Sequence, residues 1–269
     1  MIQKKKYYNC LIDFIKSDFQ SLENLQINLQ SHYLYDEGIR QLGSALTNCY
    51  MLTNLTLFLK QNEISDNGIL SLGSALMKLH NISVLALDLG DNKIEAKGIQ
   101  ILCFALNKCA NLSNLKLDIY NNNIQVKINT TNDPIFQKPT NIQKLTLDMH
   151  NNSIGNDGLL ILSSALSQCP NLLILALDLH KTGIQEKGAL ELGSALKKSN
   201  QLSTLTLDLR SNTIEIYGGI NLAADIASCK KLTILALNLK YNSIQKMHQF
   251  KLQRKCFKSK RVVKMQLFL

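Results

Sequence analysis

The chain has 269 residues, of which 45% are hydrophobic, and this content is enough to bury a full core in one or two domains. Its formal net charge of +10 is carried by the two ends. Lys4, Lys5 and Lys6 stand near the start, and residues 246–269 hold eight Lys and Arg residues and no acidic one. A uniformly basic nucleic-acid binder is therefore disfavoured, and the lack of an apolar run of about 18 residues disfavours a membrane span.

Residues 1–21 form an N-terminal flank that precedes any regular pattern. The first residues, MIQKKKYYNCLIDFI, are basic, but the apolar stretch is interrupted and no cleavage site of small residues follows. We therefore do not interpret this segment as a signal peptide. The expected location is the cytoplasm, with the cytoskeleton or a cilium as more specific alternatives.

From residue 22 onward, one pattern recurs every thirty residues. Apolar residues stand at an anchor position and two and four positions after it, which is the alternation of a half-buried strand. Asn follows seven residues after the anchor in most units, and a side-chain amide can bond the backbone groups that a tight turn leaves without partners. We therefore expect the Asn residues to be structural. The anchors are Leu25, Leu55, Leu85, Leu115, Leu145, Leu175, Leu205, Leu235 and Met265, and the asparagines are Asn62, Asn92, Asn122, Asn152, Asn212 and Asn242.

The second half of each unit changes from period two to helical spacing. In GILSLGSALMKL, residues 68–79, the apolar residues Ile69, Leu72, Ala75 and Leu76 share one face of a helix. Each unit is therefore a strand, a turn and a helix. No unit can bury its apolar face alone, but stacked units form one continuous core.

The combined motif is L-x-x-L-x-L, then N-x-I, then G-x-x-x-L-x-x-A-L, as in Leu112 with Leu115 and in Asn152 with Ile154. With this motif the sequence resembles leucine-rich repeats, and within them the long repeats of the ribonuclease-inhibitor type. The resemblance implies an α/β fold, a leucine-rich-repeat solenoid with a parallel β-sheet on the concave face and helices on the convex face. Because strands lie about 4.8 Å apart and helices about 8–10 Å apart, such a stack curves into a horseshoe.

We expect one leucine-rich-repeat domain at 22–269, with about nine strands and two irregular parts. Residues 125–140 contain two prolines and lack the Gly and the Ala-Leu pair of the other helices, which predicts a loop or a short irregular helix on the convex side. We interpret it as a tolerated irregularity in preference to a binding epitope.

Residues 246–269 form the second irregular part, a basic terminal cap. Gln253, Arg254 and Lys255 replace the small residues of the inner helices, so they fit a flank without a neighbour. The alternative is contact with an anionic membrane, a nucleic acid or an acidic protein. The residues for such a contact are Lys251, Arg254, Lys255, Lys258, Lys260 and Arg261.

Four cysteines, Cys49, Cys109, Cys169 and Cys229, occupy one equivalent position in alternate units. Sixty residues of repeat place neighbours about 10 Å or more apart, too far for a disulfide. Neither C-x-x-C nor a zinc-type Cys/His spacing occurs. Reduced thiols at helix ends, and a reducing compartment, are the expectation.

On the concave face, alternation turns two columns of side chains away from the core. Aspartates stand three residues after five anchors, and mixed, partly basic side chains stand two residues further on. The aspartates either keep the sheet hydrated and pair with neighbouring bases, or form a groove for a protein of basic or mixed charge; both can hold together. The candidate partner-binding residues are Asp88, Asp118, Asp148, Asp178, Asp208, Tyr120, His150, His180, Arg210 and Lys240.

His150 and His180 stand beside Asp148 and Asp178 in these columns, so they can make the groove pH-sensitive or bind a metal. The metal is the less favoured outcome, and we predict no metal site and no cofactor. The chain contains no phosphate-binding loop, no dinucleotide fingerprint, no H-E-x-x-H and no kinase motif, and we predict no catalytic residue.

The predicted function is therefore a non-catalytic protein-interaction scaffold that binds through its concave face and has no small-molecule substrate. Two alternatives stay open. One is a GTPase-regulating protein of the Ran GTPase-activating type, which shares this repeat, although no residue here matches that family's functional loop. The other is the recognition module of a kinase-containing or other multidomain system.

Overall fold

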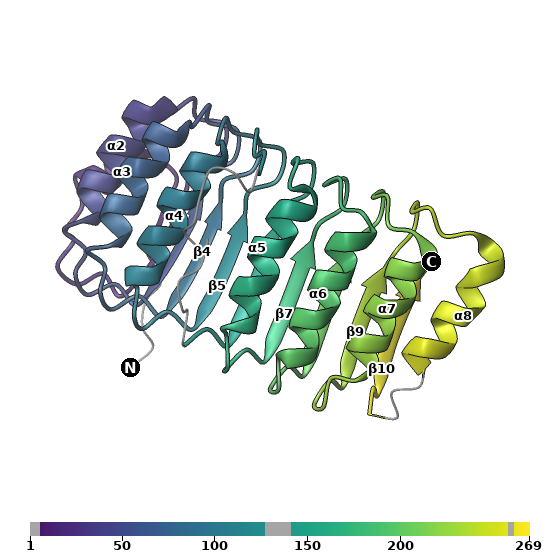
Figure 1. Cartoon of the computed structure of the whole chain (residues 1–269). Coiled ribbons are helices and arrows are strands. Elements are labelled where there is room, and N and C mark those ends of the chain that lie inside the picture. Colours follow the sequence, from purple (N-terminus) through teal and green to yellow (C-terminus); the bar gives the residue numbers. More distant parts are fainter. Residues whose placement is uncertain (1–5, 127–140, 258–260) are drawn as a thin grey trace. The chain divides into compact units, whose positions relative to one another are not determined.

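The computed structural model describes residues 6–126, 141–257 and 261–269, and the chain forms two compact units that divide between Ile124 and Gln125 (Figure 1). The irregular segment predicted at 125–140 lies outside the described residues except for its first two positions. Lys4, Lys5, Lys258 and Lys260 lie outside them as well.

The first unit is a parallel sheet whose strands follow chain order and whose helices lie on one face (Figure 1). The anchors Leu25, Leu55, Leu85 and Leu115 pair in register across it. Its elements are β1 (Lys6–Tyr8), α1 (Leu11–Ile15), β2 (Asn24–Asn28), α2 (Tyr35–Leu46), β3 (Asn54–Phe58), α3 (Asp66–Leu76), β4 (Val84–Asp88), α4 (Ala96–Lys108) and β5 (Asn114–Asp118).

The second unit has the same architecture. Leu145, Leu175, Leu205, Leu235 and Met265 pair in register across its parallel strands. Its elements are β6 (Lys144–Asp148), α5 (Gly155–Ser167), β7 (Ile174–Asp178), α6 (Glu186–Lys198), β8 (Thr204–Asp208), α7 (Ile216–Ala227), β9 (Ile234–Asn238), α8 (Lys246–Phe257) and β10 (Lys264–Phe268).

Strand, turn and helix thus repeat at the predicted interval in both units, so the leucine-rich-repeat fold class is confirmed. The core consists of the strand leucines and the inner helix face, as in Leu55, Leu57, Ile69 and Leu72, none of which is more than 1% exposed. Apolar burial of about 25 cal/mol per Å² is the main term that holds such a stack together.

The N-terminal flank contains an element that the repeat pattern did not predict. β1 pairs in parallel with β2, with Lys6 opposite Leu25, so it joins the sheet at an interval shorter than the repeat. Phe14 of α1 is fully buried and contacts Tyr8 and Phe19 edge to face, each at 5.4 Å between ring centroids. The three rings close this end of the first unit's core.

The recurring turns are held together by the Asn residues, and their predicted structural role is confirmed. Asn92 is 8% exposed, and its Nδ2 donates to the carbonyls of Leu59, Leu89 and Gly90 at 3.0–3.1 Å. Its Oδ1 accepts from the N–H groups of Asn62 and Ile64 of the preceding unit, both at 3.0 Å. Each side chain therefore joins two successive units.

The residue before each of these positions has a left-handed backbone, and in no described unit is it glycine. The φ values are 57° at Gln61, 52° at Asp91, 53° at Lys181 and 58° at Tyr241. For an L-residue this region costs roughly 1–2 kcal/mol, which the surrounding turn must offset.

Among the described residues, all seven cysteines are free thiols, and all except Cys10 are buried. Burial raises the pKa of the Cys49 thiol to about 12 and that of Cys109 to about 11. These thiols are therefore poor nucleophiles at neutral pH.

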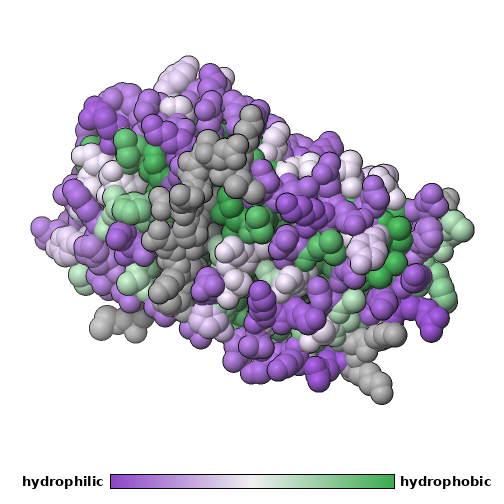
Figure 2. Space-filling view, in the orientation of Figure 1, coloured by the Kyte–Doolittle hydropathy of each residue, from purple (hydrophilic) through white to green (hydrophobic). Residues whose placement is uncertain are grey.

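Polar side chains cover most of the face that carries the helices (Figure 2). Within the part of the chain that the structure describes, no helix has both the length and the apolar character needed to cross a membrane.

Candidate functional site

The candidate site lies on the open face, by which we mean the sheet face opposite the helices in each unit. The predicted partner-binding residues lie at the end of each strand there or just after it. In the first unit Asp88 lies opposite Asp118, and in the second Asp178 lies between Asp148 and Asp208. The aspartates therefore stack in register within each unit.

Most of these aspartates close the end of their own strand. Their side-chain oxygen accepts a hydrogen bond from the N–H of the residue two positions later, which is an Asx-type turn. Asn28 and Asn238 make the same bond, so the bond needs an acceptor oxygen and not a negative charge. The bonds run from Gly90 to Asp88, His150 to Asp148, His180 to Asp178, Arg210 to Asp208, Gln30 to Asn28 and Lys240 to Asn238, at 3.0–3.3 Å.

Basic neighbours offset much of the carboxylate charge. Lys116 Nζ lies 2.7 Å from an oxygen of Asp118, whose side chain is 12% exposed. Arg210 Nε lies 3.2 Å from Asp208 Oδ2, although its N–H is not aligned for a hydrogen bond. Half-exposed pairs of this kind contribute about 0–1 kcal/mol each. At Asp118 and Asp208 the open face therefore carries paired charges and not bare carboxylates.

In the second unit, two histidines form a stacked pair. The rings of His150 and His180 are 4.3 Å apart between centroids and inclined by 13°. His150 Nδ1 lies 2.6 Å from Asp148 Oδ1, and His180 Nδ1 lies 2.7 Å from Asp178 Oδ1. An ionised carboxylate can only accept, so each Nδ1 carries a proton and each ring is held in one tautomer.

In the first unit, Tyr120 lies across Gly90 toward Lys60. A Cβ at Gly90 would stand 2.4 Å from the Tyr120 ring, so only glycine admits this pose. Lys60 Nζ lies 5.3 Å from the ring centroid and 3.1 Å from Asp91 Oδ2. Hydrogen bonds with the Tyr120 hydroxyl and then with Asp91 raise the pKa of Lys60, and burial raises the pKa of Tyr120.

Lys60 and Asp91 thus belong to the open-face cluster, although the sequence analysis did not select them. The available signal was Gly90, the only residue without a side chain in a column of long ones. Lys240, one of the predicted partner-binding residues, lies in the second unit. Its Nζ is 5.4 Å from the ring centroid of Phe268.

The basic C-terminal residues lie on α8 and just before β10. On α8, Leu252 and Cys256 are buried, whereas Met247 and Phe250 are 76% and 68% exposed. Lys251, Arg254 and Arg261 are exposed as well, and Lys255 is half-buried. Exposed apolar side chains therefore stand among cations on this surface.

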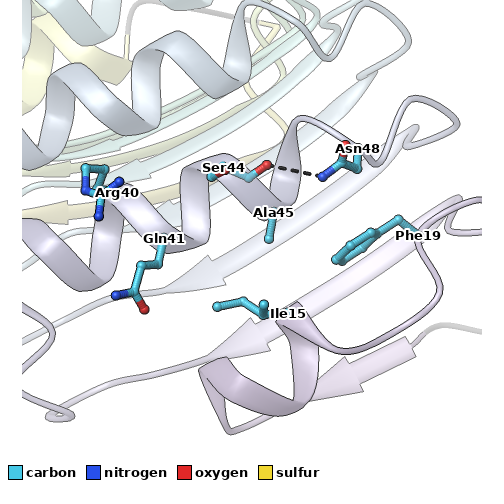
Figure 3. Close-up of a pocket in the computed structure, with 7 residues that line it drawn as sticks. All are labelled: Ile15, Phe19, Arg40, Gln41, Ser44, Ala45 and Asn48. Atoms are coloured by element: carbon cyan, nitrogen blue, oxygen red, sulfur yellow. Dashed lines mark hydrogen bonds between the residues drawn. The ribbon is translucent and has the colours of Figure 1, made fainter.

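A hollow of about 400 Å³ lies beside α1 and α2 (Figure 3). Ile15 and Phe19 line one side, and Arg40, Gln41 and Asn48 line the other. The guanidinium of Arg40 is already paired with Glu37, which holds the pKa of that carboxyl at about 2. The hollow offers no convergent set of polar groups, and we assign no ligand to it.

No protein-family model and no curated protein matches the chain. Similar solved structures are a leucine-rich-repeat protein of Leptospira interrogans, TLR13 in a complex with ssRNA13, and the actin-binding site 2 of leiomodin-1. Their identities are 17%, 18% and 17%, and their TM-scores are 0.45, 0.47 and 0.36. The aligned regions cover 98%, 92% and 42% of this chain and 70%, 36% and 64% of those chains.

The chain thus spans less than two thirds of the TLR13 and leiomodin-1 chains. At these identities the likeness is one of fold alone. The fold assignment rests on the chain's own strand register and repeating turns. The narrower resemblance to the ribonuclease-inhibitor type stays a prediction.

Proposed function

We propose that the chain is a non-catalytic repeat scaffold that binds a protein partner of mixed or basic charge through the open face. The observation that supports this proposal is the ordering of its side chains. His150 stacks on His180, and Tyr120 lies against Lys60, before any partner is present. Ordering a long side chain on binding costs about 0.5–1.5 kcal/mol, so a surface that is already ordered binds more tightly.

The composition of the same columns supports specific recognition. The leucines and asparagines repeat from unit to unit, whereas the positions of Lys60, Gly90, Tyr120, His180 and Arg210 differ in charge, size and aromaticity. Tyr and Arg are also the residues that most often dominate binding energy at interfaces. A regular framework thus presents an irregular surface, as recognition of one partner requires.

The test removes charge from the open face without breaking its turns. Because Asn28 and Asn238 make the same turn bond, the triple variant Asp148→Asn, Asp178→Asn and Asp208→Asn keeps the backbone acceptor. The partner is first captured from the native cell with the wild-type chain, and its affinity is then measured with purified proteins. We expect the triple variant to weaken binding at least tenfold.

The matched control changes the net charge equally on the helices. Asp157→Asn, Glu191→Gln and Asp225→Asn lie on α5, α6 and α7 of the same unit. This control should bind as the wild type does. Equal losses in both variants would indicate a general charge effect, and a loss in the control alone would move the site to the helix-bearing face; either result contradicts the proposal.

The two alternative functions are distinguished from the scaffold proposal by a GTPase assay and by the activity of the captured partner. Acceleration of GTP hydrolysis by the pure chain, measured with Ran and related GTPases, would replace the scaffold proposal with the regulatory one. A captured partner that phosphorylates the chain or its neighbours would favour the recognition module. The free, buried thiols are in keeping with a reducing compartment such as the cytoplasm.

The exposed surface of α8 favours a second candidate, contact with an anionic membrane. Met247 and Phe250 can enter the interfacial layer while Lys251 and Arg254 meet lipid headgroups. Sedimentation with phosphatidylserine vesicles, and not with phosphatidylcholine vesicles, is the expected result. Replacement of Met247 and Phe250 by Ser should abolish it, and unchanged sedimentation would argue against this contact.

A further inference from the structure

We propose that His150, His180 and Asp178 form a binding site for one first-row divalent metal ion, such as Zn²⁺, on the open face of the second unit. Each of the three residues offers one ligand atom, and these atoms all lie within 4.8 Å of one another. The sequence alone predicts no metal here, because spacing along the chain does not reveal ring orientation. The inference does not depend on the proposed partner binding.

The donor set fits a transition metal. Two imidazoles and one carboxylate leave further coordination positions for water, as in catalytic and exchangeable zinc sites. Magnesium and calcium prefer sites made of oxygen ligands, so two imidazoles disfavour them. All three side chains are half-buried and reach solvent from the open face, which leaves an entry path for the ion.

Asp148 prepares one ring for coordination. A metal-binding histidine typically donates its other ring N–H to a carboxylate, which fixes the tautomer and the ring orientation. Asp148 does this for His150 at 2.6 Å. Asp178 lies 2.7 Å from His180 Nδ1, and because Asp178 is itself a ligand, this bond must open when the ion binds. With Nδ1 turned to Asp148, His150 coordinates through Nε2.

The strands hold the ligands at nearly the required distance. Zn–N bonds of about 2.0–2.1 Å place the ligand atoms of a tetrahedral site about 3.3 Å apart. The present limit of 4.8 Å therefore closes by at most about 1.5 Å. Because the rings are stacked at 13°, one of them must rotate out of the stack for a nitrogen of each ring to face the same ion. β6 and β7 are paired in register, so the backbone need not move.

The surrounding charges also suit a cation. Asp148 and Asp178 bring two carboxylates to the two imidazoles. The nearest base in the next strand, Arg210, faces Asp208 at 3.2 Å, so its charge is offset. The buried cysteines do not compete, since burial raises the pKa of Cys169 and of Cys229 to about 11 and keeps both protonated.

The test is a titration of the reduced, metal-free full chain with Zn²⁺, measured by calorimetry. We expect one saturable equivalent, and at least a tenfold loss of affinity in His150→Gln and in His180→Gln. Asp148→Asn, which alters only the support of one ring, should lose about 10- to 100-fold. The control His80→Gln changes an exposed histidine of the first unit and should bind as the wild type does.

Two spectroscopic measurements on the unmodified chain keep the proposal testable if a variant folds poorly. Zn²⁺ should shift the imidazole resonances of two of the five histidines in the NMR spectrum. Co²⁺ should give d–d bands of a nitrogen and oxygen site without a thiolate charge-transfer band. A thiolate band, the absence of saturable binding, or equal affinity in the His150 and His80 variants would overturn the proposal.

Discussion

Removal of one turn amide should weaken two successive units at once. Asn92→Ala deletes five hydrogen bonds, three donated by Nδ2 to the carbonyls of Leu59, Leu89 and Gly90 and two accepted by Oδ1 from the N–H groups of Asn62 and Ile64. All five bonds are buried, so water cannot readily replace the lost partner.

The magnitude follows from these bonds. A typical intramolecular hydrogen bond contributes about 0.5–1.5 kcal/mol, and a buried group left without a partner costs about 1–3 kcal/mol. A carbonyl that still accepts a second hydrogen bond costs less when the bond from Asn92 is removed. The loss of all five bonds should therefore lower the free energy of unfolding by about 3–6 kcal/mol. Asn92→Asp should lose as much or more, because its carboxylate would face three carbonyl oxygens.

The assay is equilibrium unfolding in urea, monitored by circular dichroism. The slope of the unfolding free energy against urea concentration is compared between variants. Asn123→Ala is the matched control, since its side chain is exposed and stands in the same turn region. The control should remain within about 0.5 kcal/mol of the wild type. A loss below about 1 kcal/mol in Asn92→Ala would refute the structural role of the amide.

Three further outcomes follow from the turns, the open face and the core. Tyr241→Gly should stabilise the chain by up to about 1 kcal/mol in urea unfolding, because φ at this exposed residue is 58°. Gly90→Val should destabilise it by about 1–3 kcal/mol, since the new side chain displaces the Tyr120 ring; no change in the urea midpoint would contradict the described pose. A thiol reagent at neutral pH should modify Cys10 in the native state and Cys103 only at the rate of unfolding, because Cys103 is buried; fast modification of Cys103 would count against this core.

Much of the fold could be predicted because its determinants are local and periodic. A strand leucine such as Leu85 marks its own position, its face and its register with Leu55 and Leu115. The N-terminal strand could not be predicted in this way. It joins β2 at a shorter interval, and the contacts that fix it come from the packing of Phe14 and not from a repeated motif.

The candidate site could be predicted only as a set of positions. Alternation along the strands placed Asp178 and His180 on the open face, but it carries no information about side-chain rotamers. The bond from the His180 N–H back to Asp178 depends on the turn geometry that follows the strand. The pose of Tyr120 depends on the space left by Gly90 thirty residues earlier. Such contacts cannot be read from the sequence, because they depend on side-chain rotamers and on residues that are distant along the chain.

The turn amides also make the chain extensible. Asn92 supplies the acceptor that the unit of Asn62 needs, and Asn62 supplies the one that the unit of His32 needs. A thirty-residue segment with such an amide therefore carries one half of a joint at each border. A duplicated segment would find a matching half on both sides, whereas an insertion of any other length would leave buried amides without partners. Genetic change in such a gene is thus tolerated in whole units, and the number of units can vary while the structure of each stays the same.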